Sequence, residues 1–99
     1  MEIEKKTEGS KLTVSVTGHI DTVTAPQLEA ELVLDAVDEL VLDLSGVAYV
    51  SSAGLRVFLS AYKAMSKKGG MTIVGAQPAV LEVFKITGFA TIFKLALPR

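Results

Sequence analysis

One apolar stretch that leads into a pair of serines constrains what this chain can fold into. Residues 40–44 read Leu-Val-Leu-Asp-Leu, the composition of a buried strand, and residues 51–55 read Ser-Ser-Ala-Gly-Leu. Beyond them, apolar side chains recur with the spacing of one helix face at Leu55, Phe58, Leu59, Tyr62 and Met65. We therefore predict a buried strand that delivers two serines to a helix beginning close to Ser52.

The start of a helix requires only one capping serine, but this sequence has two adjacent serines. A hydroxyl at the cap position accepts a hydrogen bond from an unpaired amide of the first turn, and we expect Ser52 to supply such a cap. That structural role accounts for one serine. The second hydroxyl stands beside the small residues Ala53 and Gly54. This composition indicates an accessible corner where another molecule can approach.

Composition limits the class of protein. The chain has 99 residues, enough for one domain that buries roughly 60 to 70% of its unfolded surface. Hydrophobic residues make up 49% and charged residues 21%, which is typical of a folded globular protein. A formal charge of -1 argues against nucleic acid or an anionic membrane surface as a partner. The absence of cysteine fits a reducing, cytoplasmic setting, and no apolar stretch resembles a signal peptide or a membrane span.

The N-terminal half predicts two strands and a helix. Residues 12–17 alternate apolar and hydroxyl side chains, the period of a strand with one covered face, and the residues around Ile3 predict an edge strand joined to it by a turn. Thr24 and Gln27 have the spacing of a capping box. A helix is therefore expected from about Ala25.

The C-terminal half continues the alternation. Residues 67–70, Lys-Lys-Gly-Gly, predict the end of the central helix, and residues 71–74 predict the next strand. Pro78 opens a third helix that Gly88 ends, and residues 91–95 form a short final strand or an extended tail. The order β, β, α, β, α, β, α, β predicts an α/β domain with a mixed sheet and right-handed crossovers.

Few residues suggest catalysis. His19 is the only histidine and is expected in a loop after a strand. A Ser-His-Asp triad would have to use it, and a site of several imidazoles is excluded. No cofactor or metal is therefore predicted. Asp43 interrupts the apolar strand near its expected carboxyl end, where parallel sheets present ligand sites. Two interpretations stay open: a carboxylate that caps a turn or points out of the sheet, and a functional carboxylate.

Several separate segments together resemble one known family. In chain order they are residues 18–28, 40–47, 50–56, 69–70, 78–80 and 87–89. They are similar, over nearly the whole chain, to the STAS-domain family of bacterial anti-sigma factor antagonists. The resemblance implies a STAS-like single domain over residues 1–99, with a mixed β-sheet and helices packed mainly on one face.

The resemblance also implies a phosphorylation site. In the family, a serine at the start of the second helix is phosphorylated by a partner that is both anti-sigma factor and serine kinase, and a serine phosphatase reverses the reaction. By position the acceptor is Ser52, with Ser51 as the alternative. The family often has Asp-Ser-Ser-Gly here, where this chain has Ser-Ser-Ala-Gly. The predicted partner-binding residues are Asp21, Asp43, Ser51, Ala53, Gly54, Arg56 and Val57.

Three functional hypotheses follow. The favoured one is a switch: the unphosphorylated chain, a cytoplasmic monomer, binds the anti-sigma kinase, and a phosphate on Ser52 adds about -1.5 to -2 charge and releases it. The second is a STAS subunit with a constitutive docking role, for example in a lipid-transport ABC complex. The third is a hydrolase with Ser52 as nucleophile, for which only His19 could be the base.

Overall fold

The computed structural model describes residues 1–96 and contains a five-stranded sheet whose strands follow chain order, β1-β2-β3-β4-β5. The elements are β1 (Glu2–Glu8), β2 (Lys11–Ile20), α1 (Ala25–Glu31), β3 (Glu39–Val50), α2 (Ser52–Met65), β4 (Met71–Val74), α3 (Pro78–Thr87), the 3-10 helix η1 (Phe89–Thr91) and β5 (Lys94–Ala96). β1 is antiparallel to β2, and the remaining neighbours are parallel. The predicted order of elements and the mixed sheet are confirmed, although the last strand begins at Lys94 and not at Thr91, which lies in η1.

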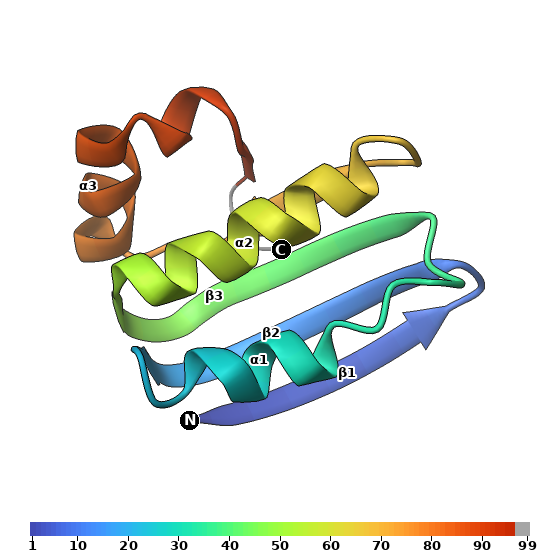
Figure 1. Ribbon diagram of the computed structural model, residues 1–99, viewed down its shortest axis with the longest axis horizontal. Coiled ribbons are helices and arrows are strands. Elements are labelled where there is room, and N and C mark those ends of the chain that lie inside the picture. Colours follow the sequence, from blue (N-terminus) through green and yellow to red (C-terminus); the bar gives the residue numbers. More distant parts are fainter. Residues whose placement is uncertain (97–99) are drawn as a thin grey trace.

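The helices cover one face of the sheet, with α1 and α2 lying side by side in front of it (Figure 1). The strand order explains this arrangement. Each α-helix joins one parallel strand to the next strand along the sheet, and right-handed crossovers that advance in one direction place every connecting helix on the same face. The prediction of helices mainly on one face is confirmed.

β3 is longer than predicted because two β-bulges let it continue. Its pairing with β2 shifts register twice, and each time β3 carries one extra residue. The buried positions of the strand change spacing as a result, from every second to every third residue; they are Leu40, Leu42, Leu44, Val47 and Val50. Apolar alternation therefore fails after Leu44 although the strand does not end there.

Glycine makes the first bulge possible. A Cβ atom on Gly46 would come within 2.9 Å of Thr17 Oγ1 on the neighbouring strand. The extension of both strands also moves two residues from their predicted places. Asp43 lies in mid-strand and not near the carboxyl end, and His19 lies within β2 and not in a loop after it.

The buried face of α2 differs from the predicted one. Leu55, Phe58 and Met65 are buried as expected, but Leu59 and Tyr62 are only half-buried. Val57 and Ala61 are buried instead, because α1 packs against that side of α2. Towards α3 the core is aromatic, with the ring centroid of Phe58 6.2 Å from that of Phe84 and 6.4 Å from that of Phe93.

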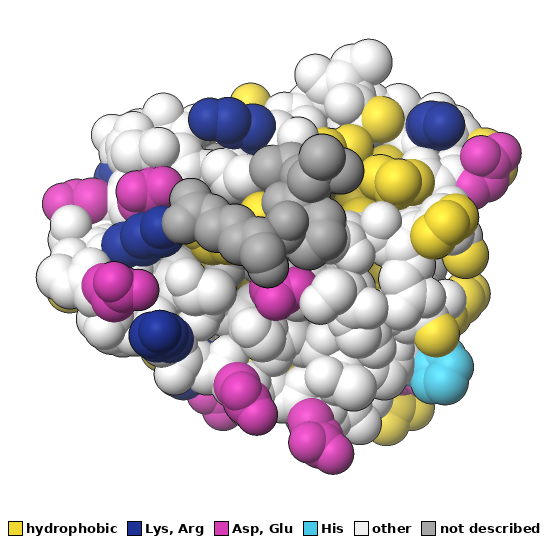
Figure 2. Space-filling view, turned by 180° about the vertical axis from the view of Figure 1, so that it is seen from behind, with side chains coloured by type: hydrophobic (Ala, Val, Ile, Leu, Met, Phe, Trp, Pro, Cys, Tyr) yellow, Lys and Arg dark blue, Asp and Glu magenta, His cyan; other side chains and the backbone are white. Residues whose placement is uncertain are grey.

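The opposite face of the sheet is polar. Thr13 and Ser15 of β2 lie between buried neighbours and so point to this face, and their partners on β1 are Lys6 and Glu4. Figure 2 shows the molecule from behind, with charged side chains of both signs scattered over this side and hydrophobic side chains gathered towards the right of the view. This alternation matches the predicted strand with one covered and one wetter face.

Candidate functional site

The two serines lie at an edge where two strands end and two helices begin. Ile20 and Val50, the last residues of β2 and β3, are paired, and the N–H of Ser51 donates to the Ile20 carbonyl (2.8 Å). Because β2 and β3 are parallel, their carboxyl ends meet here, and α1 and α2 both start from this edge (left in Figure 1). We call residues 21–24 together with residues 51–56 the Ser52 corner.

Ser51, and not Ser52, is the capping residue of α2. The N–H of Gly54 donates to Ser51 Oγ (3.4 Å), and the N–H of Leu55 donates to the Ser51 carbonyl (3.0 Å). Ser52 is the first helical residue and is exposed. No hydrogen bond within residues 1–96 involves its side chain. The expectation that the Ser52 hydroxyl caps the helix is therefore wrong, and its oxygen is left free.

The first turn of α2 carries no acidic side chain. The partial positive charge that backbone dipoles place at a helix N-terminus is therefore not balanced by an acid of its own turn. Arg56 follows Ser52 by one turn, is exposed, and lies on the same side of the helix. A negative group attached to Ser52 would meet a favourable electrostatic environment.

Two of the predicted partner-binding residues are buried. Gly54 lies against the strand ends, where an added Cβ would come within 2.6 Å of Ile20 Cγ2 and 2.9 Å of Val50 Cγ1. Val57 is only 7% exposed. Ala53 is half-buried and Arg56 is exposed. Gly54 therefore serves the close approach of helix and strands, and Ser52, Ala53 and Arg56 are accessible at the start of α2.

Asp21 fixes the turn that leads into α1. Its Oδ1 accepts from the N–H groups of Val23 (2.9 Å) and Thr24 (3.0 Å), and the Thr24 hydroxyl donates to the His19 carbonyl (2.9 Å). Donation from the Thr24 N–H, and next from the Val23 N–H, lowers the pKa of the Asp21 carboxyl below its ordinary value of 3.8. The capping box of Thr24 and Gln27 is wrong, because the Thr24 side chain makes no cap hydrogen bond.

Asp43 is not part of the Ser52 corner. Its Oδ1 accepts from the N–H (3.0 Å) and the hydroxyl (2.7 Å) of Ser45. It pairs with Ser15 on the polar face of the sheet, the face away from the helices. The interpretation of Asp43 as a carboxylate that bonds locally and points out of the sheet is the one that these contacts support.

His19 does not form a catalytic pair with a serine. Within residues 1–96 no hydrogen bond joins its ring to Ser51 or Ser52. The centroid of its ring lies instead 6.4 Å from that of Tyr49 on the adjacent strand. A serine nucleophile requires an adjacent base, so the geometry gives the hydrolase hypothesis no support.

Two exposed apolar residues, one in the Ser52 corner and one on β3, were not predicted from the sequence. Val23, in the turn before α1, is 79% exposed, and Tyr49, near the end of β3, is 50% exposed. Single exposed apolar side chains are normal on protein surfaces, so neither residue by itself defines a binding surface. The apolar Val23 between two threonines was a usable signal. Tyr49 gave none, because the second bulge of β3 determines its orientation.

The described residues contain neither a membrane-spanning helix nor a metal cluster. In residues 1–96 no helix is both long and apolar enough to cross a bilayer. In the same part of the chain no three His, Asp or Glu side chains are grouped so that they could hold a metal ion.

The mixed sheet, the helices on one face and the serine at the start of the second helix together define a small α/β domain of the STAS class. The family model of the STAS domain matches residues 2–98. The chain therefore belongs to the STAS domain family.

Relatives and solved structures agree with this assignment. BtrV of Bordetella bronchiseptica, to which an anti-sigma factor antagonist role is ascribed, is 41% identical over 93 residues, covering 89% of this chain and 79% of BtrV. The crystal structure of an anti-sigma factor antagonist from Mycobacterium paratuberculosis is similar with a TM-score of 0.85 and 34% identity, covering 99% of this chain and 86% of that one. Unphosphorylated SpoIIAA, an anti-sigma factor antagonist, shares the fold with a TM-score of 0.85 at 14% identity, covering 99% and 89%. SpoIIAA is also known in a phosphorylated form, similar with a TM-score of 0.78 at 13% identity, covering 99% and 92%.

Proposed function

We propose that this protein is an anti-sigma factor antagonist that acts as a phosphorylation-gated interaction switch. Unphosphorylated, it binds an anti-sigma factor that is also a serine kinase, and phosphorylation of Ser52 releases it. The observation that carries the proposal is the state of the Ser52 hydroxyl, which is exposed and unbonded at the first position of α2 while Ser51 provides the cap. The anti-sigma factor antagonists among the similar proteins support it.

The corner supports the chemistry of such a gate. A phosphate on Ser52 lies at the positive end of a helix without a first-turn acid, so the domain holds it without refolding. The occurrence of SpoIIAA in both forms supports the view that this fold tolerates the modification. At an interface the same phosphate adds about -1.5 to -2 charge beside a partner surface formed for a hydroxyl. Binding is thereby controlled by charge and bulk.

The remaining parts of the proposed cycle follow from the reaction. A serine phosphatase restores the hydroxyl, and the cycle operates in the cytoplasm, where ATP is available to the kinase. The proposed binding surface comprises Ser52, Ala53 and Arg56 with the neighbouring turn at Asp21. Asp43 is left out of it, because it lies on the opposite face of the sheet.

A comparison of the two phosphorylation states tests the proposal directly. The cognate anti-sigma kinase is titrated with the unphosphorylated chain in the presence of ADP, and with chain that has first been phosphorylated stoichiometrically and repurified. We expect tight binding in the first titration and a large loss in the second. Equal affinities would overturn the gate and favour the constitutive docking role.

A further inference from the structure

A groove between α1 and α2 extends from the Ser52 corner along the length of α2. Its far part is a hollow of about 240 Å³ whose apolar lining comprises Leu32, Leu34, Val57, Ala61 and Ala64. Its near part, about 220 Å³, is lined by Ala53 and Arg56, which flank Ser52. Both hollows are bordered by Glu29 and Val57, so they adjoin each other, and we call the two together the α1–α2 groove.

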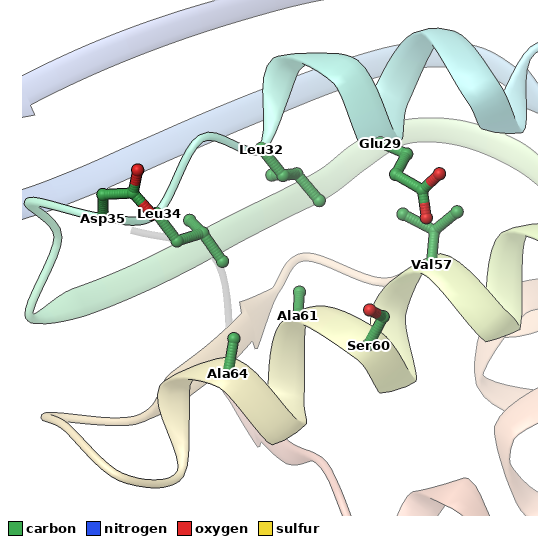
Figure 3. A pocket seen from close by; sticks show the side chains of 8 residues that line it. All are labelled: Glu29, Leu32, Leu34, Asp35, Val57, Ser60, Ala61 and Ala64. Atoms are coloured by element: carbon green, nitrogen blue, oxygen red, sulfur yellow. The ribbon is translucent and has the colours of Figure 1, made fainter.

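The groove holds one carboxylate in its middle. Figure 3 shows the Glu29 side chain directed from α1 across the gap towards Val57 on α2. Within residues 1–96 the only ion pair is that of Lys5 with Glu31 (2.9 Å), so Glu29 has no cationic partner there. Glu29 is exposed, so its carboxylate is available to a cation on a partner that fills the groove.

Cationic side chains lie near both ends of the groove, whereas its middle carries the Glu29 carboxylate. Arg56 lies at the near end. At the far end Lys68 Nζ donates to the backbone carbonyls of Leu34 (2.7 Å) and Asp35 (3.3 Å). The Asp35 side chain also lines this end of the groove. A complementary occupant therefore carries its positive charge near the middle and apolar side chains on either side of it.

We propose that the α1–α2 groove is a second docking surface for the anti-sigma kinase, occupied by an amphipathic helix that sets one Lys or Arg between apolar residues. The proposal rests on the proposed function, since the kinase must reach Ser52 and the groove begins at the residues that flank it. A helix lying in an apolar groove is a common mode of protein recognition. The groove runs to Ala64, about 18 Å from Ser52 at 1.5 Å per residue, so the helix contributes affinity away from the phosphorylated corner.

A charge reversal tests the central contact. Glu29→Lys places a cation opposite the cation of the helix, and we expect kinase binding to weaken by about tenfold or more. Glu4→Lys is the matched control, because Glu4 is an exposed acid on the polar face of the sheet. Thermal melts of both variants establish that the fold is retained. Wild-type affinity in Glu29→Lys would overturn the proposal.

Cysteine footprinting tests occupancy of the far end. The chain has no cysteine, so Ala64→Cys introduces a single thiol into the groove, and Lys6→Cys introduces one on the polar face as control. In the complex we expect maleimide to label Cys at position 64 at least about tenfold more slowly, as for a side chain removed from solvent by an interface, and to label the control at an unchanged rate. An unprotected thiol at position 64 would overturn the proposal.

Photo-crosslinking from the same position identifies the occupant. Benzophenone-maleimide on Ala64→Cys should crosslink to a helical kinase segment that has Lys or Arg among apolar residues. A crosslink to a second copy of this chain, or to a kinase loop, would overturn the proposed occupant. Failure of the wild-type chain to bind the kinase at all would overturn the proposed function and this inference with it. Normal binding and phosphorylation without groove protection would overturn this inference alone.

Discussion

Ile20 occupies the space that a side chain on Gly54 would need, with its Cγ2 atom 2.6 Å from the position of the absent Cβ. This contact joins the end of β2 to the first turn of α2, and it fixes how closely the helix approaches the strands. The position of Ser52, two residues earlier, depends on it.

Gly54→Ala should therefore destabilise the domain although alanine favours helices. The added methyl group must displace Ile20 or Val50, and we expect the free energy of unfolding to fall by about 1–3 kcal/mol. Urea unfolding measures the change. Ser60→Ala, at an exposed position of the same helix, is the control and should stay within about 0.5 kcal/mol of wild type. Wild-type stability in Gly54→Ala would show that α2 does not rest against the strands as described.

Substitutions of Ser51 and of Ser52 should have different effects: the first should lower the stability of the fold, and the second should abolish phosphorylation. Ser51→Ala removes the cap and should lower the free energy of unfolding by about 0.5–2 kcal/mol, whereas Ser52→Ala should leave it within about 0.5 kcal/mol. Incubation with the cognate kinase and labelled ATP should phosphorylate Ser51→Ala but not Ser52→Ala. Labelling of Ser52→Ala that disappears in Ser51→Ala would move the acceptor to Ser51.

Ser52→Asp and Ser52→Glu should weaken kinase binding without weakening the fold. An acid in the first turn is favoured by the helix dipole by about 0.3–1 kcal/mol, so thermal melts should not shift downwards. At the interface the charge should cost about 2 kcal/mol, roughly thirtyfold in affinity. Titrations of both variants against the kinase measure this loss. Affinity equal to wild type in both would contradict a gate controlled by charge.

Stability should depend on the ionisation of Asp21. Its carboxyl has a pKa below 3.8 in the folded chain, so the stabilisation is present above the unfolded value and is lost as the pH falls through the folded value. Asp21→Asn should therefore be less stable than wild type at neutral pH, and the difference should shrink below pH 3.8. Urea midpoints of both proteins across this range measure the effect. A difference that stays constant with pH would show that the charge of Asp21 is not involved.

Strands and helix ends that depend on neighbouring residues were predicted from local sequence patterns. Three such features are the alternation of residues 12–17, the apolar stretch at residues 40–44 and the end of the third helix at Gly88. The structure has a strand, a strand and a helix end at these places. The acceptor position came from the family resemblance, because composition alone did not distinguish Ser52 from Ser51.

Other features depend on contacts between distant segments. The bulge at Gly46 is set by Thr17 on another strand, and the burial of Val57 depends on the position of α1. Neither partner is close in sequence, so no local pattern indicates them. The cap was assigned to Ser52 in place of Ser51, an error of one residue that is usual for a helix boundary. This one residue nevertheless decides which of the two hydroxyls is free.

The two bulges of β3 decide which face of the sheet the residues just before Ser52 point to. Each extra residue turns the following side chains to the other face of the sheet, and the two bulges together restore the original alternation before Val50. A deletion of Ser45 alone would remove the first extra residue, so β2 and β3 would pair there without a bulge and Val47 and Val50 would still face the core. A single deletion should therefore be tolerated at a bulge but not within residues 40–44, where it would turn apolar side chains to the polar face of the sheet.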